Sequence, residues 1–103
     1  MVKQAAKIFE SQTTGTFVEV INSYGCESMT LQVKGSGSFQ LIISGRTNPK
    51  YDYQKMSAIT DDFGVVSTIT SNGVYSLGIG GRGSIKVELI SVSGSVDCYA
   101  NLF

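Results

Sequence analysis

The chain has 103 residues, with eight basic and eight acidic side chains and no histidine, and only 16% of its residues are charged. This length fits a single domain spanning residues 1–103 that buries about two-thirds of its unfolded surface. Zero formal net charge argues against nucleic acid or a membrane as partner, because phosphate binding needs a surplus of Lys and Arg on one face. A charge-poor surface is also weakly protected against association.

The first ten residues admit several structures. Residues 1–7 carry two lysines without the apolar segment of a secretory signal, so we expect the chain to fold in a cytoplasm. Residues 2–9 are the only candidate helix, and they lack a good N-cap. Residues 1–10 could instead form an edge segment or an arm that docks onto a partner. The sequence leaves these alternatives open.

The first half of the chain has the pattern of an all-β protein. Glycine recurs about every ten residues, and the runs between are short and rich in Val, Ile, Thr, Phe and Tyr, which is typical of a sandwich or barrel. Residues 17–21 form one such run. Residues 29–34 and 39–43 each alternate between apolar and polar side chains, as half-buried strands do. The Gly-Ser-Gly segment at 35–37 predicts a hairpin between these two strands.

The second half continues this pattern after an irregular stretch. We expect a short strand over residues 56–60 and a β-branched strand over 65–70. Asn72-Gly73 predicts a two-residue hairpin that leads into the next strand, because Asn and Gly tolerate the positive φ angles of a type I′ turn. The apolar residues of the last three strands are expected to share one face in each: Tyr75, Leu77 and Ile79; Ile85, Val87 and Leu89; and Val96, Cys98 and Ala100.

The predicted fold is therefore an all-β, antiparallel two-sheet sandwich of about eight or nine short strands. No segment is long enough for the crossover helix that parallel strands require. The strand lengths suit a two-layer sandwich of either the jelly-roll or the immunoglobulin-like type.

Catalysis and metal binding are not expected. The absence of histidine removes the commonest general base, the commonest metal ligand and every Ser-His or Cys-His arrangement. Cys26 and Cys98 cannot supply a four-ligand zinc site. Two buried thiols are favoured for them over a disulfide, although the sequence leaves pairing open. We therefore predict a protein that is not an enzyme and has no catalytic residue, cofactor or metal.

Two motifs resemble cofactor or metal sites without the context that such sites need. Residues 78–83 match the dinucleotide pattern G-x-G-x-x-G, which works only between a strand and a helix. Here the alternating segment 85–89 follows, so a turn is predicted. Asp61 and Asp62 could supply oxygen ligands to calcium, but no EF-hand spacing surrounds them. A turn with solvated carboxylates is favoured.

The irregular segment 46–53 is the candidate ligand or interface loop. Tyr51 and Tyr53 are two residues apart, so in an extended chain they project from one face beside the polar groups of Arg46 and Asn48. Sugar rings and protein interfaces both use aromatic faces with polar neighbours, and Tyr75 could extend this platform. The alternative is an ordinary surface loop in which one tyrosine folds back over the edge of the sandwich.

Nearly the whole chain resembles the small β-sandwich modules of tailed-phage virion proteins, such as head decorations, head fibres and baseplate or tail accessory domains. The resemblance rests on pattern, and on segments that include Thr-Phe-Val-Glu-Val-Ile at 16–21 and Gly-Ser-Gly-Ser-Phe-Gln-Leu-Ile-Ile-Ser-Gly-Arg at 35–46. It implies a non-enzymatic virion protein, assembled in the host cytoplasm as a homo-oligomer on capsid or tail proteins. It implies no site residues.

The sequence thus supports two functions of different classes. The first is a structural virion protein held by flat, uncharged β-surfaces. The second is a carbohydrate-binding module that uses the tyrosine-containing loop, with a host-surface glycan as its partner. The absence of tryptophan and the small number of charges favour the first.

Overall fold

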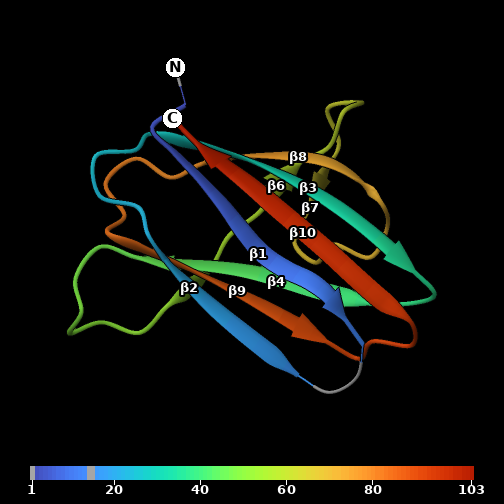
Figure 1. The fold of residues 1–103 in the computed structure, drawn as a ribbon. Helices are drawn as coiled ribbons and strands as arrows, with labels where there is room; N and C mark the ends of the chain where they lie inside the picture. Colours follow the sequence, from blue (N-terminus) through green and yellow to red (C-terminus); the bar gives the residue numbers. More distant parts are fainter. Residues whose placement is uncertain (1, 14–15) are drawn as a thin grey trace.

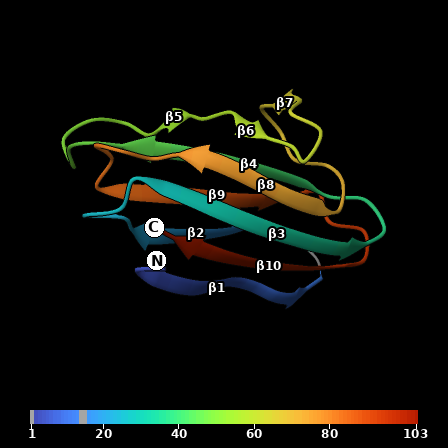
Figure 2. The same ribbon diagram turned by 90° about the horizontal axis from the view of Figure 1, so that it is seen from above.

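The computed structural model describes residues 2–13 and 16–103, which form two antiparallel sheets packed face to face (Figures 1 and 2). One sheet has six strands in the order β1-β10-β3-β8-β6-β7, and the other has four in the order β2-β9-β4-β5. The predicted all-β two-sheet sandwich is confirmed. The strands number ten in the described residues: β1 (Gln4–Gln12), β2 (Phe17–Asn22), β3 (Ser28–Ser36), β4 (Gln40–Arg46), β5 (Gln54–Lys55), β6 (Ala58–Ile59), β7 (Val65–Val66), β8 (Gly73–Gly78), β9 (Ser84–Ile90) and β10 (Ser95–Leu102).

The long strands alternate between the two sheets along the chain. Strands β1, β3, β8 and β10 belong to the six-stranded sheet, and β2, β4 and β9 belong to the four-stranded one. In an immunoglobulin sandwich, by contrast, several consecutive strands pair within one sheet. The connectivity is therefore that of a jelly roll, whose strands cross repeatedly from layer to layer.

The hairpin predicted at residues 35–37 is wrong. Strand β3 pairs with β8 and β10, whereas β4 pairs with β9 and β5, so the segment between them crosses from one sheet to the other. Backbone groups of this β3–β4 connection form hydrogen bonds with the neighbouring β9–β10 connection. The backbone amide of Ser38 donates to Ser93 Oγ at 2.8 Å, and the amide of Ser93 donates to the Ser38 carbonyl at 2.9 Å.

The hairpin predicted at Asn72-Gly73 is also wrong. Strand β7 ends at Val66, and Ile69 forms an isolated bridge with Leu41 of β4. Asn72 serves the β3–β4 crossing instead, because its Oδ1 accepts the backbone amide of Gly35 at 2.7 Å. These tertiary hydrogen bonds outweigh the local preference of the Asn-Gly pair for a tight turn.

The N-terminal segment is not a helix. Residues Gln4–Gln12 form the edge strand β1, which pairs with β10. Pairing with β10 satisfies backbone groups that a short, uncapped helix would leave open. It also lets Ile8 and Phe9 reach the core, where both are buried.

The core lies between the sheets and follows the alternation expected from the sequence. Lys86 and Glu88 of β9 point to the outer face, where they form an ion pair at 3.2 Å. Cys26 and Cys98 are unpaired buried thiols, and burial raises the pKa of Cys98 to about 12. The largest fully buried side chains come from both sheets: Met29, Leu31, Val33, Leu41, Ile43, Ile79, Ile85, Val87, Leu89, Val96, Cys98 and Leu102.

The edges of both sheets are interrupted in ways that hinder open-ended strand pairing. Strand β1 has two register shifts against β10, and Ser11 adopts a positive φ of 52°. Strands β5 and β7 have only two residues each. Glu19 of β2 lies opposite buried Val87, and therefore on the inward side of its strand, yet it remains exposed. Bulges, short edge strands and inward-pointing charges are known protections against aggregation.

A substitution at Gly94 tests how closely the β3–β4 and β9–β10 connections pack against each other. A Cβ atom at this position would overlap the carbonyl oxygen of Ser36, whereas one at Gly78 would meet nothing within 4 Å. We expect Gly94→Ala to lower the free energy of unfolding by roughly 1–3 kcal/mol, because the backbone must move. The matched Gly78→Ala variant should leave it unchanged or raise it by up to about 1 kcal/mol. Urea denaturation measures both, and equal effects would contradict the described packing.

Candidate functional site

Three loops meet at one end of the sandwich, where β2, β4 and β8 end. The backbone amide of Gly83 donates to the carbonyl of Arg46 at 3.0 Å, and the amide of Ser23 donates to the carbonyl of Gly83 at 3.1 Å. Ser23 is fully buried, and its hydroxyl donates to the Arg82 carbonyl at 2.8 Å. These hydrogen bonds join the β2–β3 and β8–β9 loops to each other and to the end of β4.

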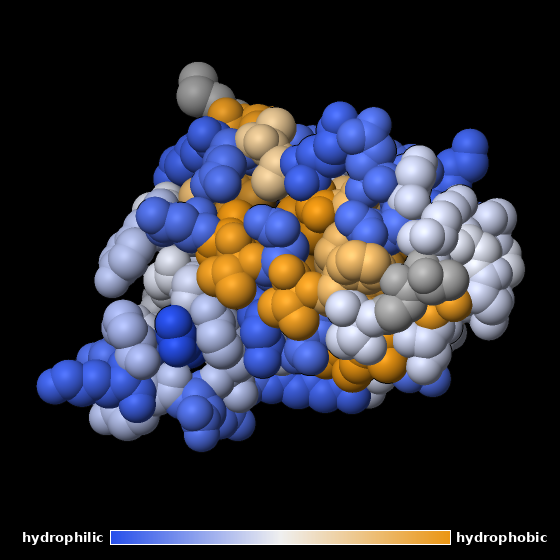
Figure 3. Space-filling view, turned by 60° about the horizontal axis from the view of Figure 1, so that its bottom comes forward, coloured by the Kyte–Doolittle hydropathy of each residue, from blue (hydrophilic) through white to orange (hydrophobic). Residues whose placement is uncertain are grey.

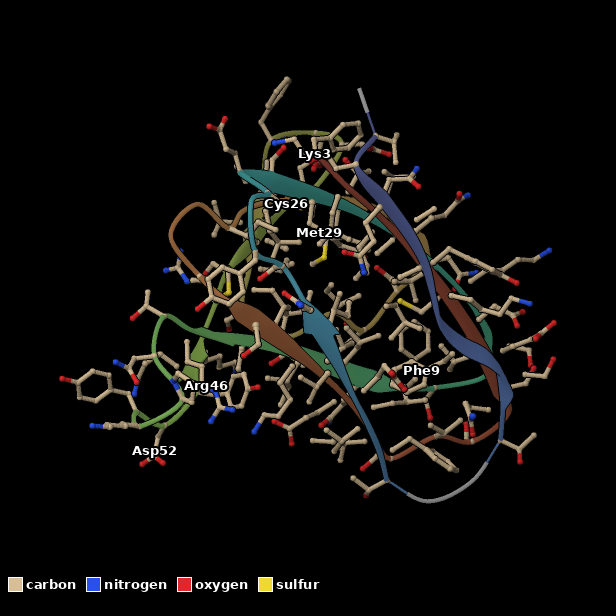
Figure 4. All side chains as sticks on the ribbon, turned by 60° about the vertical axis from the view of Figure 1, so that its left-hand side comes forward. Lys3, Phe9, Cys26, Met29, Arg46 and Asp52 are labelled. Carbon is tan, nitrogen blue, oxygen red and sulfur yellow. The ribbon has the colours of Figure 1, made fainter. Side chains whose placement is uncertain are left out.

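The loop between β4 and β5 projects from this end (Figure 1, green; Figure 4, near Asp52). It contains Asn48, Tyr51 and Tyr53 of the predicted recognition loop, whereas Arg46 is the last residue of β4. Asn48 organises it, because its Oδ1 accepts the backbone amide of Lys50 at 2.9 Å and its carbonyl accepts that of Tyr51 at 3.0 Å. Such a side-chain turn fixes a loop without strand or helix pairing.

Tyr53 folds back onto the outer face of the four-stranded sheet. The guanidinium of Arg46 lies 4.4 Å from the centroid of its ring, and Nζ of Lys86 lies 4.9 Å from it. Its hydroxyl shares a hydrogen bond with Ser84 Oγ at 3.0 Å. The ring therefore makes two cation–π contacts. We call this arrangement the Tyr53 clamp, and it ties the end of the loop to β9.

Tyr51 and Tyr75, the other two tyrosines considered for a stacking platform, have very different environments. Tyr51 is 68% exposed and faces solvent. Tyr75 is only 4% exposed, because it alternates inward with Leu77 on β8, and its hydroxyl donates to the Ser71 carbonyl at 2.7 Å. A platform that includes Tyr75 is therefore wrong. A ligand-binding or interface role for Arg46, Asn48, Tyr51 and Tyr53 stays a prediction.

A groove of about 340 Å³ separates the β4–β5 loop from strand β2. Its volume is within the range of small-ligand pockets, roughly 300–1,000 Å³. The groove contains an exposed aromatic residue that sequence reasoning passed over, Tyr24, whose side chain is 75% exposed. We call it the Tyr24 groove. Its lining residues are Val20, Asn22, Tyr24, Arg46, Thr47, Asn48, Pro49, Gly83 and Ser84.

A second groove, of about 520 Å³, lies on the other side of the same loop. It contains Tyr51 together with Arg82 and the carboxylate of Asp52. The β4–β5 loop is therefore a wall between two grooves, and Arg46 lines both. The two grooves differ in their charged groups: Arg46 is the only charged residue that lines the Tyr24 groove, whereas Arg82 and Asp52 also line the second groove.

The outer face of β2 carries an apolar patch beside the Tyr24 groove. Val18 and Val20 are each 52% exposed, and they lie opposite Glu88 and Lys86 on the outward side of the sheet. Figure 3 views the molecule from the side that is at the bottom of Figure 1, and hydrophobic side chains gather near the middle of this face.

Within residues 2–13 and 16–103, no group of three or more Cys, Asp or Glu side chains is placed to hold a metal ion. The described residues also contain no helix long and apolar enough to cross a membrane.

Solved structures provide the only similarities found, because no protein-family model and none of the curated proteins matches the chain. The crystal structure of the SPBc2 prophage-derived protein YomS is 18% identical, with a TM-score of 0.86 over 96% of this chain and 90% of YomS. The PBSX exported protein XepA is 14% identical, with a TM-score of 0.85 over 96% of this chain but 37% of XepA. The chain thus covers nearly all of YomS but only a little over a third of XepA. At these identities the likeness shows a shared fold.

Removing the Tyr53 ring should release the β4–β5 loop while the sandwich stays folded. Tyr53→Ala deletes one hydrogen bond and two cation–π contacts, each contributing on the order of 1 kcal/mol. We expect faster amide hydrogen exchange at residues 46–53 and little change in β9. The exposed Tyr51→Ala variant is the matched control and should exchange like the original chain. If both variants behave alike, the clamp does not hold the loop.

Proposed function

We propose that the chain is a non-catalytic structural protein of a phage or prophage particle: a capsid decoration, head-fibre or tail accessory sandwich. The observation that carries this proposal is the fold shared over 96% of the chain with two proteins whose names mark them as YomS of the SPBc2 prophage and XepA of PBSX. The jelly roll is also an architecture that viral capsid proteins use. We place the chain in the virion, assembled in the host cytoplasm.

The ionisable groups support a non-catalytic role. Active sites usually hold acids or bases whose pKa values move towards the working pH. In the described residues the displaced carboxyl pKa moves the other way: a hydrogen bond from Thr60 and the backbone amides of a turn lower the pKa of Asp62. The pKa of Lys7 is raised by the exposed Glu10 beside it. Both shifts belong to solvated surface pairs.

We propose the outer face of β2 as the contact with other virion proteins or with further copies of the chain. Val18 and Val20 stand exposed on the outer face of a sheet in a protein with few charges to oppose association. Buried apolar area is the main favourable term in most protein association.

Mass spectrometry of purified particles from the strain that encodes the chain tests this role. We expect the chain at a stoichiometric level, and we expect Val18→Lys to reduce its incorporation at least roughly tenfold by placing a charge in the contact. Val65→Lys is the matched control, because Val65 is a valine of the other sheet that is more exposed than Val18. Absence of the original chain from particles, together with a monomeric mass in solution, would contradict the proposal.

Carbohydrate binding is the second candidate function, and one specific observation favours it. The Tyr24 groove combines an exposed aromatic ring with amide side chains, as sugar sites do. Arg46 at the end of β4 and Asn48 of the β4–β5 loop line this groove, whereas Tyr51 lines the second groove and Tyr53 is held in its clamp. A host-surface glycan would be the natural partner.

A further inference from the structure

We propose that the Tyr24 groove binds a sugar ring that carries a carboxylate, such as a hexuronate unit of an acidic polysaccharide. The inference rests on the second candidate function and names its ligand class. Three properties of the groove support it: an apolar surface for a ring, amide donors, and one positive charge without a competing carboxylate in the lining.

The apolar surface comes from Tyr24, Val20 and Pro49, which come from three different segments. The ring of Tyr24 lies against Gly83, since a Cβ atom built on that glycine would be 3.1 Å from the tyrosine Cε2. The backbone of Gly83 is itself hydrogen-bonded to Ser23 and Arg46. Tyr24 is therefore supported from below and exposed above, which suits stacking against the C–H face of a sugar.

The amide donors come from Asn22 and Asn48, on opposite walls of the groove. Asn22 Oδ1 accepts the backbone amide of Tyr24 at 3.1 Å, and Asn48 Oδ1 accepts that of Lys50 at 2.9 Å. These bonds identify the oxygen of each side chain and leave both NH₂ groups as donors. Two donor groups of this kind fit the hydroxyl and carboxylate oxygens of an acidic sugar.

The positive charge comes from Arg46, which the Tyr53 clamp holds in place. Its protein hydrogen bonds are long, because Nε lies 3.4 Å from Ser84 Oγ and Nη1 lies 3.4 Å from the Pro49 carbonyl. Its N–H groups therefore retain donor capacity for a ligand. A guanidinium binds a carboxylate with two parallel hydrogen bonds, and no Asp or Glu lines this groove to compete. The second groove adds both Arg82 and Asp52, so a ligand carboxylate there would meet a competing protein carboxylate.

Calorimetric titration with trigalacturonate, its fully methyl-esterified form and sodium acetate tests the ligand class. We expect the ester to bind at least roughly tenfold more weakly than the acid, because it loses the charge-assisted hydrogen bonds to Arg46. Acetate at the same concentration should not displace the acid. Equal binding of acid and ester would overturn the acidic preference and leave carbohydrate binding in place. Displacement by acetate would reduce the groove to a simple anion site, and no binding of either sugar would overturn both inferences.

Two variants locate the site on the molecule. Tyr24→Ala removes the stacking surface, and Asn48→Asp keeps the acceptor for Lys50 while replacing the donor with a negative charge. Each should weaken trigalacturonate binding by roughly tenfold or more. Tyr51→Ala is the matched control on the other groove and should bind like the original chain. Circular dichroism and thermal unfolding verify that each variant folds. Loss of binding in Tyr51→Ala but not in Tyr24→Ala would place the site in the second groove and overturn the proposal.

Discussion

The structure depends on one constraint: each long strand has a single apolar face, and these faces can be buried only against one another. Ile85, Val87 and Leu89 of β9 are fully buried, while Lys86 and Glu88 between them face outward. Strand β10, in the opposite sheet, likewise alternates between buried and outward-facing side chains. Because successive long strands belong to opposite sheets, every connection between them must cross the thickness of the sandwich. These connections therefore lie at the two ends of the sandwich. Hydrogen bonds between neighbouring connections hold the loops in place.

The candidate site follows from this arrangement. At one end, the crossing loops are joined through the backbone of Gly83, which bonds to both Ser23 and Arg46. This junction places Tyr24 beside the β4–β5 loop, although 22 positions separate Tyr24 from Arg46 in the chain. The outer face of β2, with Val18 and Val20, continues from the same end. The features proposed for assembly and for ligand binding are therefore neighbours, and they are carried by different side chains apart from Val20.

Much of the fold could be predicted from local pattern. Period-two alternation identified the buried faces of β8, β9 and β10 because burial on one face leaves a direct record in the sequence. Strand partners leave no such record. The Asn-Gly pair at 72–73 predicted a hairpin, yet Asn72 bonds to Gly35 and Ile69 pairs with Leu41, in each case a partner distant in sequence. The same limit applies to the 35–37 segment, where a crossing looks locally like a turn.

The site was predicted less well than the fold, for a related reason. The sequence placed Arg46 and Asn48 in an irregular loop, which the structure confirms for Asn48, whereas Arg46 is the last residue of strand β4. It left open which tyrosines would be free to bind, because tertiary contacts decide this: Tyr75 alternates into the core, and the ring of Tyr53 contacts Arg46 and Lys86. Tyr24 was missed because only the folded chain shows that its ring lies against Gly83. An aromatic residue within an Asn-Ser-Tyr-Gly turn was the one local signal.

We propose that the chain contacts its particle through the outer face of β2 and the neighbouring Tyr24 groove. Hydroxyl-radical footprinting tests this contact most directly. The chain would be labelled free in solution and within purified particles. All five residues to be followed are exposed in the free chain. In the particle we expect Val18, Val20 and Tyr24 to be protected from labelling. Phe63 and Tyr99, which belong to the other sheet and its loops, should remain reactive. Protection of Phe63 and Tyr99 with continued labelling of β2 would contradict the proposed contact.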